Sequence, residues 1–430
     1  MNRRYFLSTI AAAAAKPRRA VAANDKLTIA CVGVRGRAGH LLRGFLDLPD
    51  VDVAMLCDID SRLLPAAARL VEEKKGKAPR TTGDFRRALD DKSIDAIVVG
   101  TPDHWHAIPT VLACQAGKHV YVEKPCSHNV REGQVMLAAA RKHNRVVQVG
   151  IQSRSGRHFA EAYEYIRSGA LGKVVLARGW EASKQKTTGR PADTVVPEGV
   201  DYDMWLGPAP KRPFNPNRFH STWRWFFDYG TGDLGNDGVH RTDYARRGLE
   251  AAFTGMGRTL PEWPTAVTST GGKLYFDDDQ EFPDTLMTTW EYPSAMLTYE
   301  MRIWSPTPLE GEAEGAAIYG DNGSVVIGNQ GWRAYDAKGK LLPNGTQSGN
   351  DQADPAHKRN FVDCIRNNST PVCDIAIGHV ASSLTHMGNI AWRVGRRLRF
   401  DAATQTFMND AEANRLLTRT YRAPWVLPKV

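Results

Sequence analysis

Residues 26–150 alternate between short apolar runs and amphipathic segments, and this alternation limits the possible folds more than any other feature of the chain. The apolar runs lie at 26–34, 51–60, 93–102, 119–125 and 145–152. Segments with the helical spacing of apolar residues separate them. Parallel strands need crossover connections, which are usually helices. The pattern therefore predicts an α/β N-terminal domain with a doubly wound parallel sheet.

The sequence pattern changes after Gly150. One helical segment follows, and then strand-like runs separated by turn residues such as Asp321-Asn322-Gly323. Two further helical segments lie near the end of the chain, at 359–368 and 379–396. We expect residues 24–150 to form the first domain. Residues 151–430 are expected to form an α+β domain with a large, mainly antiparallel, open-faced sheet, whose last helices pack back on the first domain.

The first 23 residues have the pattern of an export signal. Arg3 and Arg4 precede an apolar stretch, and Ala20-Val21-Ala22 supplies small residues for cleavage. Paired arginines before Tyr5 indicate a twin-arginine signal, which carries folded proteins. The segment predicts a periplasmic protein that receives its cofactor before export. The alternative is a chance alanine-rich helix.

Charge and composition exclude several classes of function. No run reaches the roughly 18 apolar residues that a membrane span needs. The formal charge is +9, but residues 1–22 carry five basic residues and no acid, so the rest of the chain has about +4. Basic residues form no stripe, so nucleic acid is not expected as a partner. The six cysteines lack the spacing of metal ligands. We therefore predict no metal site and no disulfide framework, with Cys31 and Cys57 as core residues.

A glycine-rich turn follows the first strand and opens a helix, the context of a dinucleotide-binding Rossmann motif. Gly33 takes the first glycine position, whereas Arg35 replaces the middle glycine and Ala38 takes the last position. Gly36 is expected to allow close backbone approach. Arg35 or Arg37 is expected to contact a phosphate. A Gly-rich turn without a ligand is the alternative.

Asp58 ends the second strand, 25 residues after Gly33. A carboxylate at this place binds the hydroxyls of adenosine ribose and repels a 2′-phosphate. The sequence therefore favours NAD, while Arg62 leaves NADP open. The other interpretation of Asp58 is a helix N-cap.

The loop after the third strand lies at the carboxyl edge of the predicted sheet, where ligands bind in open α/β folds. Thr101 and Pro102 end this strand, and His104 and His106 follow them. All four are expected to line the cofactor site. For His106 an N-cap or packing role is an equal alternative.

Several motifs together resemble one family. Glu-Lys-Pro at 123–125, Thr-Pro-Asp-His-Trp-His-Ala at 101–107 and the Gly-rich turn resemble glucose–fructose oxidoreductase, inositol dehydrogenase and the rhizopine-catabolism proteins (Gfo/Idh/MocA). The segments 203–210, 232–243 and 378–396 resemble the exported branch of that family. The resemblance covers nearly the whole chain after the signal. It implies an oxidoreductase that moves hydride between a substrate hydroxyl and NAD.

The resemblance also implies roles for the Glu-Lys-Pro residues. Lys124 would face the nicotinamide and the substrate, where an ammonium group can hold a developing alkoxide. Glu123 would fix the lysine or the backbone, and Pro125 would follow a cis bond.

The family has a second site, an aspartate followed four residues later by a histidine on one helix face. His240 matches the histidine, and Asn236 stands at the aspartate position. We expect His240 to be the general base, with a pKa suited to neutral pH, and Asn236 to bind the substrate. On a continuous helix Asp237 would point about 100° away. Asp243 would support the helix from the side of His240.

The segment 217–233 combines aromatic rings with arginine, which suits a sugar because rings stack on C–H faces and arginine binds hydroxyls. We expect contacts from His220, Trp223 and Arg224. Gln152 and Arg154 follow the fifth strand and are expected at the same pocket. Aromatic core residues are the alternative for the rings.

The sequence thus predicts a periplasmic oxidoreductase that acts on a sugar or glycoside with a tightly bound NAD. An NAD-dependent glycoside hydrolase, which oxidises C3 transiently and eliminates the glycoside, is a second hypothesis. A sugar-binding protein without activity is the third, supported by Arg35 and Asn236. The resemblance further implies a homodimer or homotetramer that assembles through the open face of the second sheet, with no membrane partner after signal removal.

Overall fold

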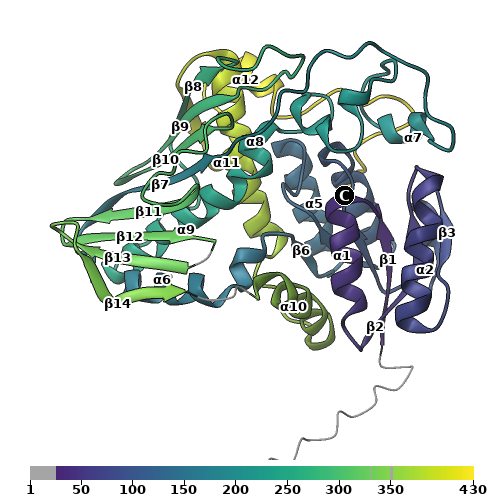
Figure 1. Ribbon diagram of the computed structural model, residues 1–430, viewed down its shortest axis with the longest axis horizontal. Helices are drawn as coiled ribbons and strands as arrows, with labels where there is room; N and C mark the ends of the chain where they lie inside the picture. Colours follow the sequence, from purple (N-terminus) through teal and green to yellow (C-terminus); the bar gives the residue numbers. More distant parts are fainter. Residues whose placement is uncertain (1–25, 330, 349–351) are drawn as a thin grey trace, which may run out of the picture.

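The computed structural model describes residues 26–329, 331–348 and 352–430 (Figure 1). The predicted signal segment, residues 1–23, lies outside the described residues. The described chain forms a six-stranded sheet and a ten-stranded sheet, each with its own helices.

The six-stranded sheet is parallel throughout, in the order β3-β2-β1-β4-β5-β6. Its strands are β1 (Leu27–Val32), β2 (Val51–Cys57), β3 (Arg80–Thr82), β4 (Ala96–Val99), β5 (His119–Val122) and β6 (Val147–Val149). The predicted doubly wound parallel sheet is confirmed. Strand β3 was not predicted, because three polar residues at a sheet edge carry no hydrophobic pattern.

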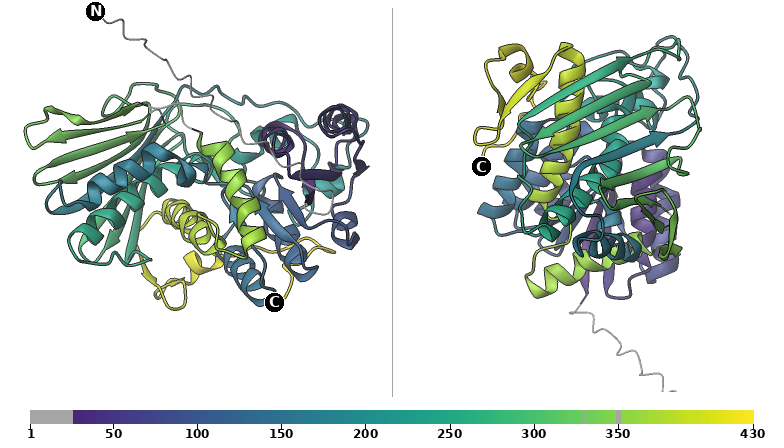
Figure 2. Two further views of the ribbon diagram at one scale, coloured as in Figure 1. Left: turned by 90° about the horizontal axis from the view of Figure 1, so that it is seen from below. Right: turned by 90° about the vertical axis from the view of Figure 1, so that its left-hand side faces the viewer.

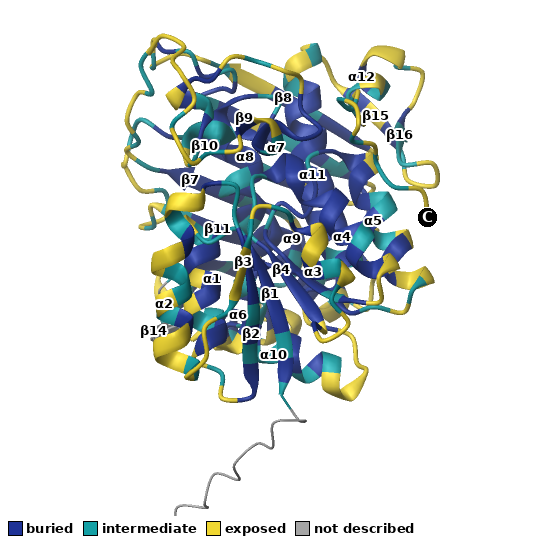
Figure 3. Ribbon diagram, turned by 90° about the vertical axis from the view of Figure 1, so that its right-hand side faces the viewer, coloured by how far each residue is buried: buried dark blue, intermediate teal, exposed yellow. Residues whose placement is uncertain are grey.

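Helices cover both faces of this sheet. They are α1 (Gly36–Leu46), α2 (Leu64–Lys75), α3 (Arg86–Asp90), α4 (Ala107–Gln115) and α5 (Val130–Lys142). Because side chains alternate along a strand, Ile29 packs with α1 and α2 while Ala30 packs with α4 and α5. Strands buried on both faces read as continuous apolar runs. Figure 3 shows β1 and β4 buried between helices whose outer surfaces are exposed.

The second sheet has the order β14-β13-β12-β11-β7-β10-β9-β8-β15-β16. Its strands are β7 (Val174–Ala182), β8 (Ala266–Gly272), β9 (Thr285–Tyr292), β10 (Ala295–Arg302), β11 (Glu314–Gly320), β12 (Gly323–Gly328), β13 (Gly331–Asp336), β14 (Leu341–Ser348), β15 (Leu398–Asp401) and β16 (Thr406–Phe407). Strands β7 and β10 pair in parallel, and the other neighbours are antiparallel. The prediction of a mainly antiparallel sheet is confirmed.

Long helices lie on one face of the second sheet, and its other face is open (Figure 2). The helices are α6 (Arg157–Arg167), α9 (Gly238–Gly255) and α11 (Ile375–Val394). Helix α9 approaches β7 closely at Gly179, where an added Cβ would lie 2.7 Å from the backbone oxygen of Arg241. On the open face Met287 and Met296 are exposed beside the Arg178–Glu300 ion pair.

The C-terminal region packs on the first domain. Helix α10 (Ala353–Asn367) places Phe361 against Phe45 and Tyr121, with ring centroids 6.1 and 5.7 Å apart. In the final segment the ring of Trp425 lies edge-on to Trp105 at 4.7 Å. Three short helices complete the described fold: α7 (Tyr202–Leu206), α8 (Gly232–Asn236) and α12 (Ala411–Arg415).

All six cysteines are buried and unpaired. Burial raises the pKa of the thiols of Cys31 and Cys114 to about 12, so they behave as small core residues. In the described part of the chain, no helix combines the length and the apolar character that crossing a membrane requires.

Candidate active site

A cleft opens where the carboxyl ends of β1, β2, β4 and β5 face the segment 204–236. Its empty space, including the open mouth, is about 1260 Å³. Many of the predicted residues line it: Gly33, Arg35, Gly36, Arg37, Asp58, Thr101, Pro102, His106, Glu123, Lys124, His220, Trp223, Arg224 and Asn236. Others are not part of its lining: His104, Gln152, Arg154, His240 and Asp243.

The glycine-rich turn forms one wall of the cleft. Gly33 has a φ of +93°, and an added Cβ would lie 3.1 Å from the carbonyl oxygen of Gly100, so only glycine fits there. Gly36 also has a positive φ, and a Cβ there would contact nothing within 4 Å. The side chain of Arg35 is exposed at the mouth. The turn thus leaves its backbone accessible at the N-terminus of α1.

Arg37 lines the cleft, but its guanidinium is held by two carboxylates. Nε donates to Glu123 at 2.6 Å and Nη2 donates to Asp354 at 2.6 Å. Its predicted role was phosphate binding, whereas these bonds join the glycine turn, the Glu-Lys-Pro loop and α10.

Asp58 stands at the carboxyl end of β2, as predicted. Its Oδ2 accepts a hydrogen bond from the backbone N–H of Val34 at 2.9 Å, and Oδ1 accepts one from Asp60 at 3.0 Å. Burial raises the pKa of Asp58 above its ordinary value, although these backbone donors oppose the shift. The carboxylate therefore ties the glycine turn to β2 as well as facing the cleft.

Asp60 was not singled out in the sequence, yet it organises this corner of the site. Its side chain is 1% exposed and accepts two hydrogen bonds from Arg62 at 2.7 Å. The Nε2 atom of His220 lies 3.3 Å from the same carboxylate. His220, which was predicted to bind substrate, therefore contacts the end of β2. The sequence did not indicate a role for Asp60, because aspartate is common in turns that follow a strand.

The two histidines of the loop after β4 have separate environments. The ring of His106 bridges two carbonyl oxygens, with Nδ1 2.7 Å from Pro125 and Nε2 2.8 Å from Thr101. It joins the loops after β4 and β5 at the cleft. His104 is 1% exposed and packs against Trp205 and Tyr229 outside the cleft. Burial lowers the pKa of His104 to about 3, so its predicted cofactor contact is replaced by packing.

Glu123 is the buried anchor of the Glu-Lys-Pro loop. Besides Arg37, its carboxylate accepts hydrogen bonds from the backbone N–H of Lys124 at 3.1 Å and from Gln152 at 3.3 Å. Burial alone would raise its pKa, but the charges of Arg37 and Lys124 outweigh burial and hold the pKa below its ordinary value. Glu123 thus stays ionised. Gln152 binds the carboxylate of Glu123 and does not line the cleft.

Lys124 projects into the cleft toward the start of α9. Its Nζ donates to the carbonyl oxygen of Asn236 at 2.7 Å and to Oδ1 of the same residue at 3.1 Å. Oδ1 of Asp237 lies 4.0 Å from Nζ. The Lys124–Pro125 peptide bond is cis, as the family resemblance implied.

The predicted helix through Asn236 and His240 is interrupted. Helix α8 ends at Asn236 and α9 begins at Gly238, so Asp237 lies at the junction. Asp237 keeps a helical backbone, with φ −97° and ψ −32°, yet its Oδ1 lies 4.0 Å from Nζ of Lys124, so the expectation that it points away was wrong. His240 is half-buried, and burial together with the charges of Lys124 and Arg241 lowers its pKa well below the ordinary value. The prediction of a pKa suited to neutral pH was also wrong.

Arg154, which was expected at the substrate pocket, instead forms a buried ion pair with Asp243. Arg154 donates to both oxygens of Asp243, at 2.6 and 3.1 Å, and the side chains are 10% and 1% exposed. The pair fixes the start of α9 relative to the segment after β6. Trp223 and Arg224, by contrast, are half-buried in the cleft wall as predicted, with the guanidinium 6.0 Å from the indole centroid.

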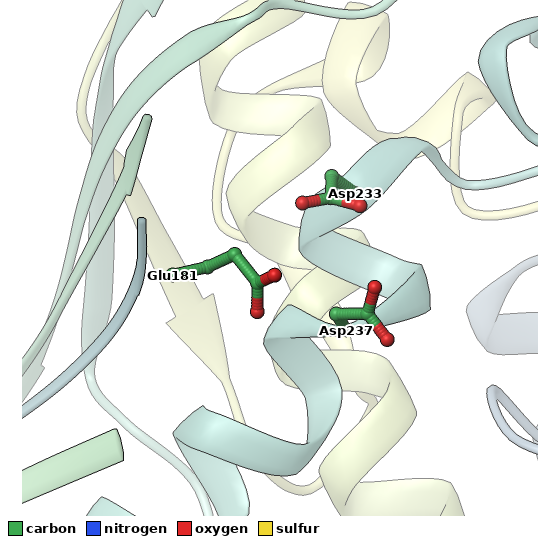
Figure 4. A group of neighbouring side chains, drawn as sticks. All are labelled: Glu181, Asp233 and Asp237. Carbon is green, nitrogen blue, oxygen red and sulfur yellow. The ribbon is translucent and has the colours of Figure 1, made fainter. Parts of the chain in front are cut away.

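Three carboxylates meet beside Lys124, which the sequence analysis did not foresee. Glu181 of β7, Asp233 of α8 and Asp237 at the junction each place an oxygen within 4.8 Å of the others (Figure 4). Burial and mutual repulsion raise the pKa of Asp233 to about 7 and that of Glu181 to about 10. The sequence did not indicate that these carboxylates meet, because β7 and α8 are 50 residues apart in the chain.

Two protein-family models together match most of the chain. Residues 27–151 match an oxidoreductase family, NAD-binding Rossmann fold, and residues 176–250 and 309–427 match the C-terminal alpha/beta domain of the same family. A levoglucosan dehydrogenase of Pseudarthrobacter phenanthrenivorans is 28% identical over 194 residues, 45% of this chain and 42% of that protein. A glycosyl hydrolase family 109 protein of Stenotrophomonas maltophilia is 35% identical over 133 residues, 29% of each chain.

The matches thus span less than half the length of these two relatives. Among solved structures, levoglucosan dehydrogenase with NADH and levoglucosan superposes with a TM-score of 0.66 at 18% identity, over 87% of this chain and 99% of that one. At this identity the likeness shows the fold.

Proposed function

Because the chain belongs to the Gfo/Idh/MocA oxidoreductase family, we propose that it is an NAD-dependent oxidoreductase acting on a hydroxyl group of a sugar or polyol. The relative named levoglucosan dehydrogenase supports a carbohydrate substrate. The observation that carries the proposal is Lys124, whose ammonium group lies at the wall of the cleft beside the polar atoms of Asn236.

The cleft fits a dinucleotide in three respects. The N-terminus of α1 behind Gly36 provides backbone N–H groups for a pyrophosphate. Asp58 at the end of β2 faces the cleft, where ribose hydroxyls can reach it. The hydroxyl of Thr101 is buried at the cleft wall without a hydrogen-bond partner among the described residues, so a bound group can satisfy it. Arg35 and Arg62 keep a 2′-phosphate, and hence NADP, as the alternative.

When bound in this cleft, NAD would supply the hydride acceptor, and the residues of the chain would position the substrate and its proton. The ammonium group of Lys124 has three N–H bonds, and Asn236 takes two of them. The third is free to donate to the substrate oxygen and to stabilise negative charge that develops there. His240 does not line the cleft, but it lies four residues after Asn236, which does. It is neutral at pH 7 because of its lowered pKa, and we keep it as the proposed proton acceptor. Trp223 and Arg224 supply the ring face and charged donor that suit a sugar.

One experiment tests the cofactor and the reaction together. Nucleotide released from the denatured, freshly purified protein is identified by mass spectrometry, and a panel of sugars and polyols is then screened for NADH formation. We expect about one NAD(H) per chain. Lys124→Met should keep the nucleotide and lower kcat by about 10²–10³-fold, whereas Lys142→Met, an exposed lysine at the end of α5, should change neither. A protein that binds no nucleotide would refute the proposal and favour a sugar-binding protein.

A second candidate function is an NAD-dependent glycoside hydrolase. The match to a glycosyl hydrolase family 109 protein favours it. Transient oxidation of C3 makes the C2 proton acidic, and loss of the glycoside followed by water addition and reduction returns the cofactor unchanged. Cleavage of a nitrophenyl glycoside without net NADH would support this function. Formation of a free ketosugar would support the oxidoreductase.

The cellular location and assembly are proposed on separate grounds. Arg3 and Arg4 support export to the periplasm by the twin-arginine pathway, and replacing both with lysine should leave the protein in the cytoplasm. The exposed side chains of Met287 and Met296 on the open face support a homodimer or homotetramer. Light scattering of a Met287→Lys variant, which places a charge on that face, should show dissociation.

A further inference from the structure

The three carboxylates beside Lys124 come from two separate parts of the second domain. Glu181 extends from β7, and Asp233 and Asp237 lie on α8 and the junction that follows it (Figure 4). One oxygen from each residue lies within 4.8 Å of the other two. Near this group β7 and α9 approach closely at Gly179, where an added Cβ would lie 2.7 Å from the backbone oxygen of Arg241.

The group lacks matching positive charge. Oε2 of Glu181 and Oδ2 of Asp233 are buried and accept no hydrogen bond from the described residues. Nε of Arg241 lies 3.7 Å from Glu181, but Nη2 of this arginine donates to Glu314. At the other side, Nζ of Lys124 is 4.0 Å from Asp237. Gln185 donates to Oδ1 of Asp233 at 3.4 Å, and Asn236 donates to Oδ2 of Asp237 at 3.0 Å. One buried oxygen of Glu181 and one of Asp233 remain without a donor among the described residues. A buried charged oxygen without a donor is costly, which indicates that a further positive group belongs here.

A tyrosine provides an independent sign of a ligand. Tyr299 lies on β10 next to β7 and projects from the same face of the sheet as Glu181. It is 1% exposed, and its hydroxyl has no hydrogen-bond partner among the described residues. This hydroxyl would lie 2.8 Å from a Cβ added to Gly238, the residue after Asp237, so it faces the group. A buried hydroxyl without a partner is rare in proteins and calls for a bound ion or water.

We propose that Glu181, Asp233 and Asp237 bind a hard divalent cation of the Mg²⁺, Mn²⁺ or Ca²⁺ class. Such cations take carboxylate oxygens at about 2.0–2.6 Å, so two oxygens on one ion can be separated by up to about twice that distance. The 4.8 Å limit on the oxygens therefore allows a shared ion. Water fills the remaining positions and supplies a hydrogen-bond partner for Tyr299. All ligands are hard oxygen atoms, which disfavours zinc and copper.

The test uses the full chain and Mn²⁺ as the probe. Protein dialysed against EDTA and then against metal-free buffer is titrated with Mn²⁺, and free ion is followed by electron paramagnetic resonance. We expect one ion per chain. Asp233→Asn and Glu181→Gln keep the side-chain shapes and should each lower the affinity at least tenfold. Glu412→Gln, which alters an exposed acid on α12, should bind like the wild type.

Thermal unfolding separates a lost site from a lost fold. In EDTA, Asp233→Asn should melt at or above the wild-type temperature, because it removes repulsion between carboxylates. Mn²⁺ should raise the melting temperature of the wild type and leave that of the Asp233→Asn variant unchanged. The proposal is refuted if the wild type binds no more Mn²⁺ than the Glu181→Gln/Asp233→Asn double variant. In that case protonation, and not a bound cation, neutralises the three carboxylates. Neither measurement needs NAD or sugar, so its outcome is independent of the proposed function.

Discussion

The bond between Arg37 and Glu123 gives a quantitative test of how the Glu-Lys-Pro loop is held. Glu123 is buried with 5% of its side chain exposed, and Arg37 supplies its cationic partner at 2.6 Å. Removing one partner of a buried ion pair costs about 3–5 kcal/mol. Since Arg37 is 34% exposed, water screens part of the interaction. We expect Arg37→Met to lower the free energy of unfolding by about 2–3 kcal/mol.

The pH dependence of this loss follows from the pKa of Glu123. In the wild type the pKa is lowered, so its stabilising effect is full above the unfolded value of about 4.3 and is lost as pH falls through the folded value. Without Arg37, burial is less opposed and the pKa of Glu123 rises. The difference in stability between wild type and Arg37→Met should therefore be largest near pH 7 and should shrink toward pH 4.5.

Differential scanning calorimetry at several pH values measures this difference. A loss of 2–3 kcal/mol corresponds to a fall of about 5–10 °C in melting temperature for a domain of this size. Arg35→Met removes an equal charge from an exposed position in the same turn and should shift the melting temperature by less than about 2 °C. A difference that stays constant between pH 7 and pH 5, or that Arg35→Met reproduces, would refute the reasoning.

Three further predictions concern the second domain. Gly179→Ala places a methyl group 2.7 Å from the backbone oxygen of Arg241, and calorimetry should show a loss of about 1–3 kcal/mol. Arg154→Met leaves Asp243 buried without its cation and should cost about 3–5 kcal/mol, while equilibrium dialysis shows unchanged NAD binding because the pair lies outside the cleft. The imidazole of His240 should show no titration between pH 6 and 8 by NMR, since its pKa is lowered; the native state then loses stability as pH falls below the unfolded value of about 6.5. A titration midpoint near pH 6.5 would contradict the environment that lowers the pKa of His240.

The regular parts of the fold were predictable from the sequence because buried helix and strand faces give a periodic pattern of apolar residues. Strands such as β1 and β4, covered on both faces, appear as apolar runs with clear ends. Strand β3 has only three polar residues, and its position depends on pairing with β2. Such pairing depends on distant residues and leaves no local pattern.

The site was predictable where one motif contributes residues to one edge of a sheet. Lys124 and Asn236, which the family resemblance placed at the substrate, both line the cleft, and Asp58 stands at the end of β2. The errors arose where neighbours come from elsewhere in the chain. Burial and the charges of Lys124 and Arg241 set the pKa of His240, and none of these effects follows from spacing along a helix.

The packing of α10 against α1 has a consequence for the order of folding. Phe361 fills the space between Phe45 and Tyr121, yet it is made more than two hundred residues after β6. At about 5–20 residues per second of synthesis, the first domain waits roughly 10–40 s for this part of its core. During that time the apolar face that Phe361 covers stays open to water. A fragment ending at residue 150 should expose the same face and aggregate.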